Sequence, residues 1–122
     1  MSAHKNQPFA CRLRFAAAGL LYGLVAERSL RLQVAVFGLV VIALLVLEPG
    51  ALWWALVMVA SAAVLGAELL NTALERLTDH LHPDVHPQIR IVKDCAAGAV
   101  LLSVLGAIGV AIALAVHLLS GR

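Results

Sequence analysis

Residues 51–79 read ALWWALVMVASAAVLGAELLNTALERLTD and decide the fold of the chain. Residues 51–67 have no polar side chain apart from Ser61, and the next twelve residues, which follow without a break, carry three carboxylates. Apolar residues all around a helix indicate that lipid or protein surrounds it. We therefore predict one helix over residues 51–81, about 45 Å long at 1.5 Å per residue, whose polar end extends beyond the hydrocarbon core.

The polar end of this helix carries four side chains on one face. Glu68, Asn71, Glu75 and Asp79 lie at positions i, i+3, i+7 and i+11, so they fall within about 60° of one another around the helix. Charged groups at the edge of a membrane span are costly and usually functional. Three carboxylates repel one another, and Mg²⁺ relieves that repulsion through its oxygen ligands. The stripe therefore predicts a divalent cation site, with a structural ion-pair network as the alternative.

The whole chain has the composition of an integral membrane protein. Of its 122 residues, 62% are hydrophobic, and the mean hydropathy is +0.96. In a soluble domain only about half of the residues are apolar. A single copy of so small a chain has little room to enclose both a lipid-facing surface and a polar site. We therefore expect an oligomer whose copies share the site.

Two further apolar segments flank the central helix. Residues 30–47 are separated from it by Glu48-Pro49-Gly50, a tight turn with two strong helix breakers. Residues 91–119 follow a loop in which Pro83 and Pro87 end helical structure. Both segments are predicted to cross the membrane as helices, because a helix satisfies its backbone hydrogen bonds within one segment in lipid.

Residues 8–28 show a different pattern, in which apolar side chains are mixed with Arg12 and Arg14. Such a mixture is typical of a helix that lies in the plane of the membrane interface. Gly19 and Gly23 are four residues apart, which favours the close approach of another helix. The predicted fold is an all-α integral membrane protein, with three transmembrane helices plus an N-terminal amphipathic interfacial helix. It forms a single membrane domain over residues 1–122.

The basic residues are distributed unevenly between the two sides of the membrane. The turn at residues 48–50 has neither Lys nor Arg, whereas the opposite side carries Lys5, Arg12, Arg14, Arg28, Arg31, Arg76, Arg90 and Lys93. Positive residues stay cytoplasmic in proteins with short loops, so the N-terminus and the second loop are predicted to be cytoplasmic. The C-terminus at Arg122 is then outside. Basic residues spread along membrane edges do not indicate nucleic-acid binding.

Charged residues from the other segments add to the stripe. Lys93-Asp94 starts the third span and is suited to hold phosphate oxygens, although a surface pair is the plainer interpretation. Glu27 lies at the same membrane edge, as a metal ligand or as a solvated charge. Glu68 is the acid closest to the membrane interior, so it is best placed to act as a base on a hydroxyl that arrives from the lipid. The pattern indicates phosphoryl transfer, which depends on positioning and charge neutralisation.

The second loop contains His80, His82 and His86. Their proximity suggests zinc, but no cysteine accompanies them in the loop and the prolines disrupt regular geometry. A solvated loop on the nucleotide side is therefore the favoured interpretation. Neither G-x-x-x-x-G-K-[ST] nor G-x-G-x-x-G occurs in the sequence, so a bound nucleotide is not held by a familiar phosphate loop.

Taken together, these motifs match a known pattern. Glu68-Leu-Leu-Asn71-Thr-Ala-Leu-Glu75, followed by Asp79 and by Ile-Val-Lys93-Asp94-Cys-Ala-Ala-Gly-Ala, resembles the prokaryotic diacylglycerol kinase family. Glu27-Arg28-Ser-Leu-Arg31 is similar to the acidic patch that precedes the first span of that family. The resemblance extends over most of residues 9–119 and includes the three-span layout.

The resemblance implies a small kinase of the bacterial inner membrane that works as a homotrimer, uses ATP and Mg²⁺, and phosphorylates a lipid alcohol. It implies that Glu68 is the catalytic base and contacts the lipid substrate. Glu27 and Glu75 are the implied metal ligands. The implied ATP-binding residues are Asn71, Glu75, Asp79, Asp84, His86, Lys93 and Asp94.

Two segments depart from the better-known proteobacterial form, namely Gln88-Ile-Arg90-Ile-Val92 and Cys95-Ala-Ala-Gly98. They look closer to the undecaprenol kinase branch. The leading hypothesis is a kinase that forms phosphatidic acid from diacylglycerol, with undecaprenol as the alternative acceptor. Two hypotheses come from other classes: a small ion-coupled transporter, which usually places its acid in mid-span, and a noncatalytic assembly subunit. ATP consumption that depends on added lipid separates the kinase from both.

Overall fold

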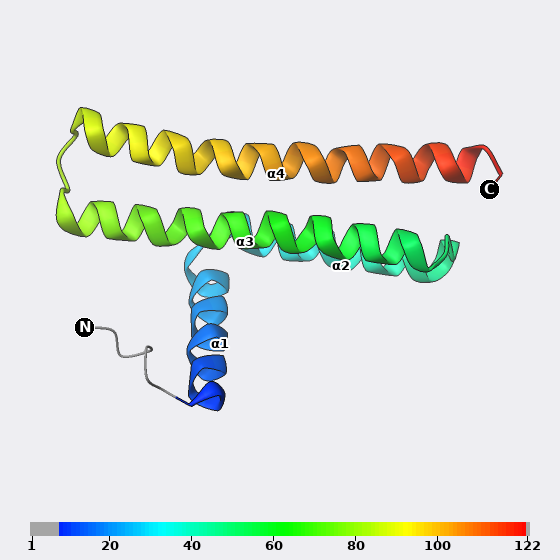
Figure 1. The fold of residues 1–122 in the computed structure, drawn as a ribbon, viewed down its shortest axis with the longest axis horizontal. Coiled ribbons are helices and arrows are strands. Elements are labelled where there is room, and N and C mark those ends of the chain that lie inside the picture. Colours follow the sequence, from blue (N-terminus) through cyan, green and yellow to red (C-terminus); the bar gives the residue numbers. More distant parts are fainter. Residues whose placement is uncertain (1–7, 122) are drawn as a thin grey trace.

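The computed structural model describes residues 8–121, and all regular structure in this range is helical. Lys5 and Arg122, which entered the prediction of topology, lie outside the described residues. The four helices are α1 (Phe9–Ala26), α2 (Arg28–Leu47), α3 (Ala51–Leu81) and α4 (Pro87–Leu119). Helices α2, α3 and α4 run alongside one another, whereas α1 runs crosswise to them (Figure 1). The ends of α3 and α4 that meet at the second loop extend past the start of α2 (Figure 1).

Helix α3 is the central helix of the chain, because it contacts each of the other three helices. In the described part of the chain, α2 and α4 do not contact each other. Seven residues of α4 that are at least half shielded form a series with alternating spacings of four and three, the repeat by which helices pack in a left-handed coiled coil. They are Ala96, Val100, Ser103, Ala107, Val110, Leu114 and His117.

The break between α1 and α2 falls at Glu27, whose backbone is extended at φ −113° and ψ 116°. The first helix was predicted to reach residue 28 and the next to begin at residue 30, so both of these bounds are wrong by two residues. The Arg31 Nη1 group donates hydrogen bonds to the carbonyl oxygens of Leu24 and Val25, at 2.9 and 2.8 Å. It thereby satisfies carbonyls of the last turn of α1, which have no partner within that helix.

Helix α1 is attached to the other helices through Gly23. A Cβ atom at this position would lie 2.7 Å from Cδ2 of both Leu30 and Leu69, so α2 and α3 approach the backbone of α1 more closely than a side chain allows. Gly19, for which the same close approach was predicted, has nothing within 4 Å of the corresponding position. The close approach predicted for the two glycines therefore occurs at Gly23.

Two turns reverse the chain between the long helices. Glu48 ends α2 in the left-handed region at φ +48°, and Gly50 follows at φ +111°, a value that favours glycine. At the other turn the His86 Nδ1 atom accepts a hydrogen bond from the Gln88 N–H group at 3.1 Å, and Pro87 occupies the first position of α4. The last helix was predicted to begin at residue 91. This cap explains why α4 begins earlier, at Pro87.

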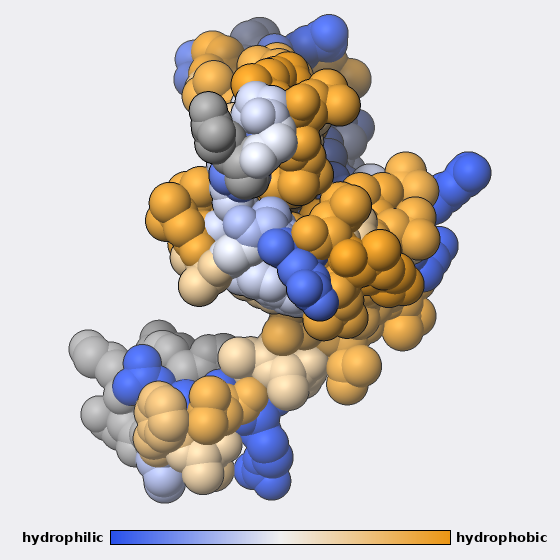
Figure 2. Space-filling model, turned by 90° about the vertical axis from the view of Figure 1, so that its right-hand side faces the viewer, coloured by the Kyte–Doolittle hydropathy of each residue, from blue (hydrophilic) through white to orange (hydrophobic). Residues whose placement is uncertain are grey.

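The surface of the described chain is strongly apolar. Within residues 8–121 the buried apolar side chains are those of Leu30, Leu44, Val57 and Ala96. Apolar side chains cover much of the face shown in Figure 2, and all four helices are long and apolar enough to cross a membrane. A surface of this kind requires lipid or other protein around it. The predicted all-helical membrane protein is confirmed, and α1 meets the same criteria of length and composition as the other three helices.

Candidate active site

Glu68 is a buried carboxylate at the contact between α3 and α2, with 6% of its surface exposed. Its Oε2 atom accepts a hydrogen bond from Ser29 Oγ at 3.1 Å, and its Oε1 atom accepts one from Gln33 Nε2 at 3.0 Å. No ion pair in residues 8–121 includes Glu68. The carboxylate is therefore held in place by neutral donors, an arrangement that suits a base more than a charge used only for structure.

Ser29 and Gln33 were not among the predicted site residues. They lie 39 and 35 residues before Glu68 in the sequence, and their contact with it depends on how α2 packs against α3. One local feature of the sequence could have pointed to these two residues. A serine and a glutamine spaced by four residues share a helix face, and Gln33 is an amide beside a long apolar run.

Glu27 lies next to the turn of α3 that carries Glu75. Its Oε2 atom is 3.7 Å from Nη2 of Arg76, the residue that follows Glu75. The Arg76 guanidinium also lies 5.4 Å from the centre of the Tyr22 ring in α1, within the range of a cation–π contact. The break between α1 and α2 thus brings the carboxylate of Glu27 to Arg76 of α3, which is next in sequence to the stripe residue Glu75.

Asp79 faces a different helix from Glu68. Its Oδ1 atom forms an ion pair with Lys93 Nζ at 2.6 Å, which joins the end of α3 to the first turns of α4. Eleven residues separate Glu68 from Asp79, or about 16 Å along the helix axis. Within residues 8–121 no three His, Cys, Asp or Glu side chains come together as a metal site. The three carboxylates of α3 are therefore spread along the helix axis and do not cluster, and the predicted cation site with Glu27 and Glu75 as ligands stays a prediction.

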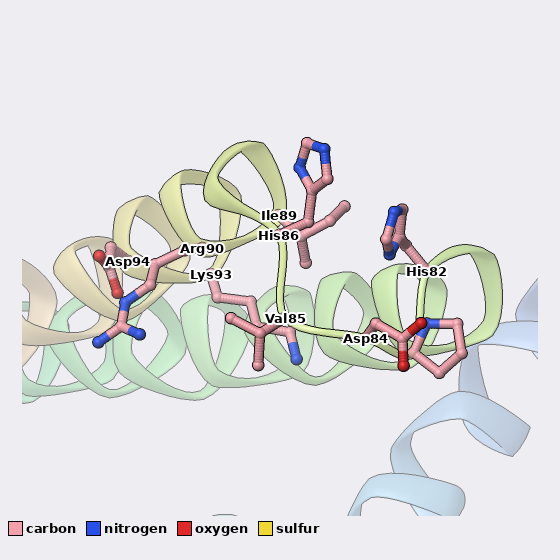
Figure 3. Close-up of a pocket in the computed structure, with 9 residues that line it drawn as sticks. His82, Asp84, Val85, His86, Ile89, Arg90, Lys93 and Asp94 are labelled. Carbon is pink, nitrogen blue, oxygen red and sulfur yellow. The ribbon is translucent and has the colours of Figure 1, made fainter.

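A cavity of about 300 Å³ lies at the loop between α3 and α4 (Figure 3). It brings together four of the predicted ATP-binding residues: Asp84, His86, Lys93 and Asp94. It also includes Arg90, which lies one helical turn before Lys93 and was not among the predicted site residues. The His82 and His86 rings are 4.8 Å apart between centres. The cavity combines cationic side chains with ring faces, which suits a phosphorylated ligand with an aromatic base.

A second hollow, a groove of about 680 Å³, lies between α1 and α3 and was not predicted. Its walls are mostly apolar, with Arg76 as its charged residue. On the side of α3 it begins at Leu69, directly after Glu68, and continues through Thr72 and Ala73 to Arg76. A groove of this character suits an acyl chain that leads to the turn of α3 that carries Glu68.

Three buried polar atoms on α2 and α3 have no hydrogen-bond partner within the described residues. They are Gln33 Oε1, Asn71 Oδ1 and Thr72 Oγ1. Asn71 and Thr72 lie within about one turn of Glu68 on α3, and Gln33 contacts Glu68 directly. The large majority of buried side-chain polar atoms are normally paired. The region therefore offers hydrogen-bonding capacity to a polar ligand, and the oxygen donors of Glu27, Asn71 and Glu75 are of the type that Mg²⁺ prefers.

Comparisons with known proteins show which proteins the chain is similar to. A family model described as "Prokaryotic diacylglycerol kinase" matches residues 14–115. A protein named diacylglycerol kinase from Synechocystis sp. is 38% identical over 96 residues, which cover 78% of this chain and 55% of that protein. The aligned part thus spans about half the length of this relative. The residues matched by the family model include the break at Glu27, the stripe of α3 and the start of α4.

Proposed function

The chain belongs to the prokaryotic diacylglycerol kinase family, and on that basis we propose that it is an ATP-dependent lipid kinase. It transfers the γ-phosphoryl group of ATP to the hydroxyl of diacylglycerol, and the products are phosphatidic acid and ADP. The observation that carries this proposal is the buried Glu68 carboxylate, which neutral donors hold in place. Unpaired polar atoms and an apolar groove lie close to it.

Glu68 acts as the base in this proposal. The acceptor hydroxyl hydrogen-bonds to the carboxylate, which takes its proton as the hydroxyl oxygen attacks the γ-phosphorus atom and the bond from phosphorus to the leaving oxygen of ADP breaks. The apolar groove between α1 and α3 supports an acceptor with a hydrocarbon chain, because its walls match that chain in polarity. Water is excluded from Glu68 by its burial, which favours transfer to an alcohol over hydrolysis.

The nucleotide lies on the side of α3 and α4 in this proposal. Lys93 and His86 approach the phosphates and the base from the loop cavity, together with Asp84 and Asp94. Asp79 supports Lys93 through their ion pair. Glu27 and Glu75 would hold Mg²⁺, which when bound supplies neutralisation of phosphate charge. Asn71 contributes an oxygen atom on the same stripe.

The distribution of charge and of apolar surface supports the following proposed placement in the membrane. Helices α2, α3 and α4 cross the bacterial inner membrane, and α1, which runs crosswise to them, lies in the interface. The N-terminus and the second loop are cytoplasmic, where ATP is available, and the C-terminus is outside. The resemblance to the family implies a homotrimer, in which neighbouring copies would cover part of the large exposed apolar surface of one copy and complete the site.

The test is an assay of purified protein with Mg²⁺ and ATP labelled on its γ-phosphate. Diacylglycerol, undecaprenol and ceramide are offered in parallel at equal mole fraction in mixed micelles. We expect label in the lipid fraction with the highest kcat/KM for diacylglycerol. Preferential labelling of undecaprenol would reassign the acceptor, and no lipid-dependent ATP consumption with any of the three would overturn the kinase. The transporter and the assembly subunit would then be the remaining hypotheses.

A further inference from the structure

The two hydrogen bonds to Glu68 come from one face of α2. Ser29 and Gln33 are four residues apart, so their side chains lie one above the other on that helix. Ser29 Oγ reaches Oε2 of Glu68, and Gln33 Nε2 reaches Oε1. Each carboxylate oxygen therefore has its own donor, and the two donors fix the plane of the carboxylate and its distance from α2.

Without such donors, a glutamate side chain is poorly determined. Its terminal torsion is broad, so a carboxylate at the end of three rotatable bonds samples many orientations. Transfer of a phosphoryl group is sensitive to the position of the group that orients the attacking hydroxyl, and small displacements slow such reactions strongly. A pair of neutral donors limits the orientation of the carboxylate and leaves its negative charge uncompensated. A lysine or arginine in the same place would compensate that charge.

We propose that Ser29 and Gln33 are positioning residues that hold the Glu68 carboxylate in the orientation needed for attack by the lipid hydroxyl. The inference rests on the proposed function, because it assigns a role to two residues through the proposed base. Gln33 makes the larger contribution, since it is partly buried and Ser29 is exposed to solvent that competes for its hydrogen bond. The polar residue at position 33, beside a long apolar run, thereby has a function.

The kinetic test compares Gln33→Met and Ser29→Ala with the wild type, using diacylglycerol and ATP. Methionine has the length of glutamine but cannot donate a hydrogen bond. We expect kcat to fall about tenfold in Gln33→Met and about threefold in Ser29→Ala, with the KM for ATP unchanged. Ser29→Thr keeps the hydroxyl and should restore kcat to within about twofold of the wild type.

The control is Ser103→Ala, which removes a hydroxyl that donates to the Val100 carbonyl oxygen within α4 and does not touch Glu68. It should leave kcat at the wild-type value. A wild-type kcat in both Gln33→Met and Ser29→Ala would overturn the positioning role. So would a kcat for Ser29→Thr as low as that for Ser29→Ala, or a change in the KM for ATP alone.

A spectroscopic measurement tests the two contacts without turnover. The carboxylate stretching bands of Glu68 are assigned in isotope-edited infrared spectra by subtraction of the Glu68→Gln spectrum. We expect these bands to shift in Gln33→Met and in Ser29→Ala, and unshifted bands would overturn the inference. If the wild type phosphorylates no lipid alcohol, the proposed function fails and the positioning role with it. Shifted bands would then still establish the two hydrogen bonds, so the two failures are distinguishable.

Discussion

The Arg76 guanidinium of α3 forms an ion pair with the Glu27 carboxylate at the break between α1 and α2, with 3.7 Å between Nη2 and Oε2. Because Glu27 is a proposed Mg²⁺ ligand, Arg76 competes with the ion for the same carboxylate. We predict that Arg76→Gln lowers the Mg²⁺ concentration for half-maximal transfer by about two- to fivefold, as expected for an exposed ion pair worth up to about 1 kcal/mol. A titration of the initial rate with Mg²⁺ measures this change.

Arg28→Gln is the matched control for that titration. Arg28 is exposed, adjacent to Glu27 in sequence, and has no ion pair within the described chain. Its Mg²⁺ requirement should remain that of the wild type. A higher Mg²⁺ requirement in Arg76→Gln would contradict the assignment of Glu27 as a ligand.

Gly23 and Gly19 offer a matched pair in one helix. In Gly23→Ala the new methyl group meets Cδ2 of Leu30 and of Leu69, so α1 or these side chains must shift. We predict destabilisation of about 1 kcal/mol or more and a lower transfer rate, because α1 forms one wall of the groove. Gly19→Ala meets nothing within 4 Å and should gain up to about 1 kcal/mol from helix propensity.

Thermal unfolding midpoints in one detergent, together with initial rates, compare the two alanine variants. Equal stability of Gly23→Ala and Gly19→Ala would contradict the close packing of α1 on α2 and α3.

Thr72 and Thr78 are both 5% exposed but differ in hydrogen bonding. Thr72 Oγ1 has no partner within the described residues, whereas Thr78 Oγ1 donates to the Glu75 carbonyl oxygen at 3.1 Å. Thr72→Val should therefore raise stability by about 1 kcal/mol and Thr78→Val should lower it by a similar amount. Thr72→Val should also raise the KM for the lipid if its hydroxyl serves the acceptor. Shifts of the same sign in the two unfolding midpoints would refute this account of Thr72.

Lys93 joins α4 to Asp79 of α3, and both side chains of this pair are well exposed, at 38% and 60%. The pair therefore contributes at most about 1 kcal/mol to stability, and the proposed role of Lys93 is to hold ATP. We predict that Lys93→Met raises the KM for ATP tenfold or more with little change in the unfolding midpoint. Lys93→Arg keeps the charge on a differently shaped group, so its KM for ATP should lie between those of the wild type and of Lys93→Met. A wild-type KM for ATP in Lys93→Met would remove this residue from the nucleotide site.

The helical layout was predictable because it depends on local chemistry. Seventeen residues with one polar side chain dictate a lipid-embedded helix, and Gly50 and Pro83 mark the region where it begins and ends. The predicted start of the last helix at residue 91 was late because the capping action of His86 involves a backbone N–H group two residues away. Composition gives no sign of such a bond.

The site was predictable only in part. Helical periodicity gives the angle of a residue around the axis, so it placed Glu68, Glu75 and Asp79 on one face. It does not show that Glu68 and Asp79 are about 16 Å apart along that axis, too far for the three carboxylates to cluster within the described residues. The contacts of Ser29 and Gln33 with Glu68, and the groove beside Gly23, arise from packing between helices that are distant in sequence.

The most direct test of the central claim is the rate of phosphoryl transfer from labelled ATP to diacylglycerol by Glu68→Gln. Glutamine has nearly the same size as glutamate and can still bond to Ser29 and Gln33, but its amide cannot take a proton from the hydroxyl. We predict that the variant folds, assembles and binds ATP like the wild type, and that its kcat falls by a factor of about 100 or more. Turnover at the wild-type rate would contradict the assignment of Glu68 as the base.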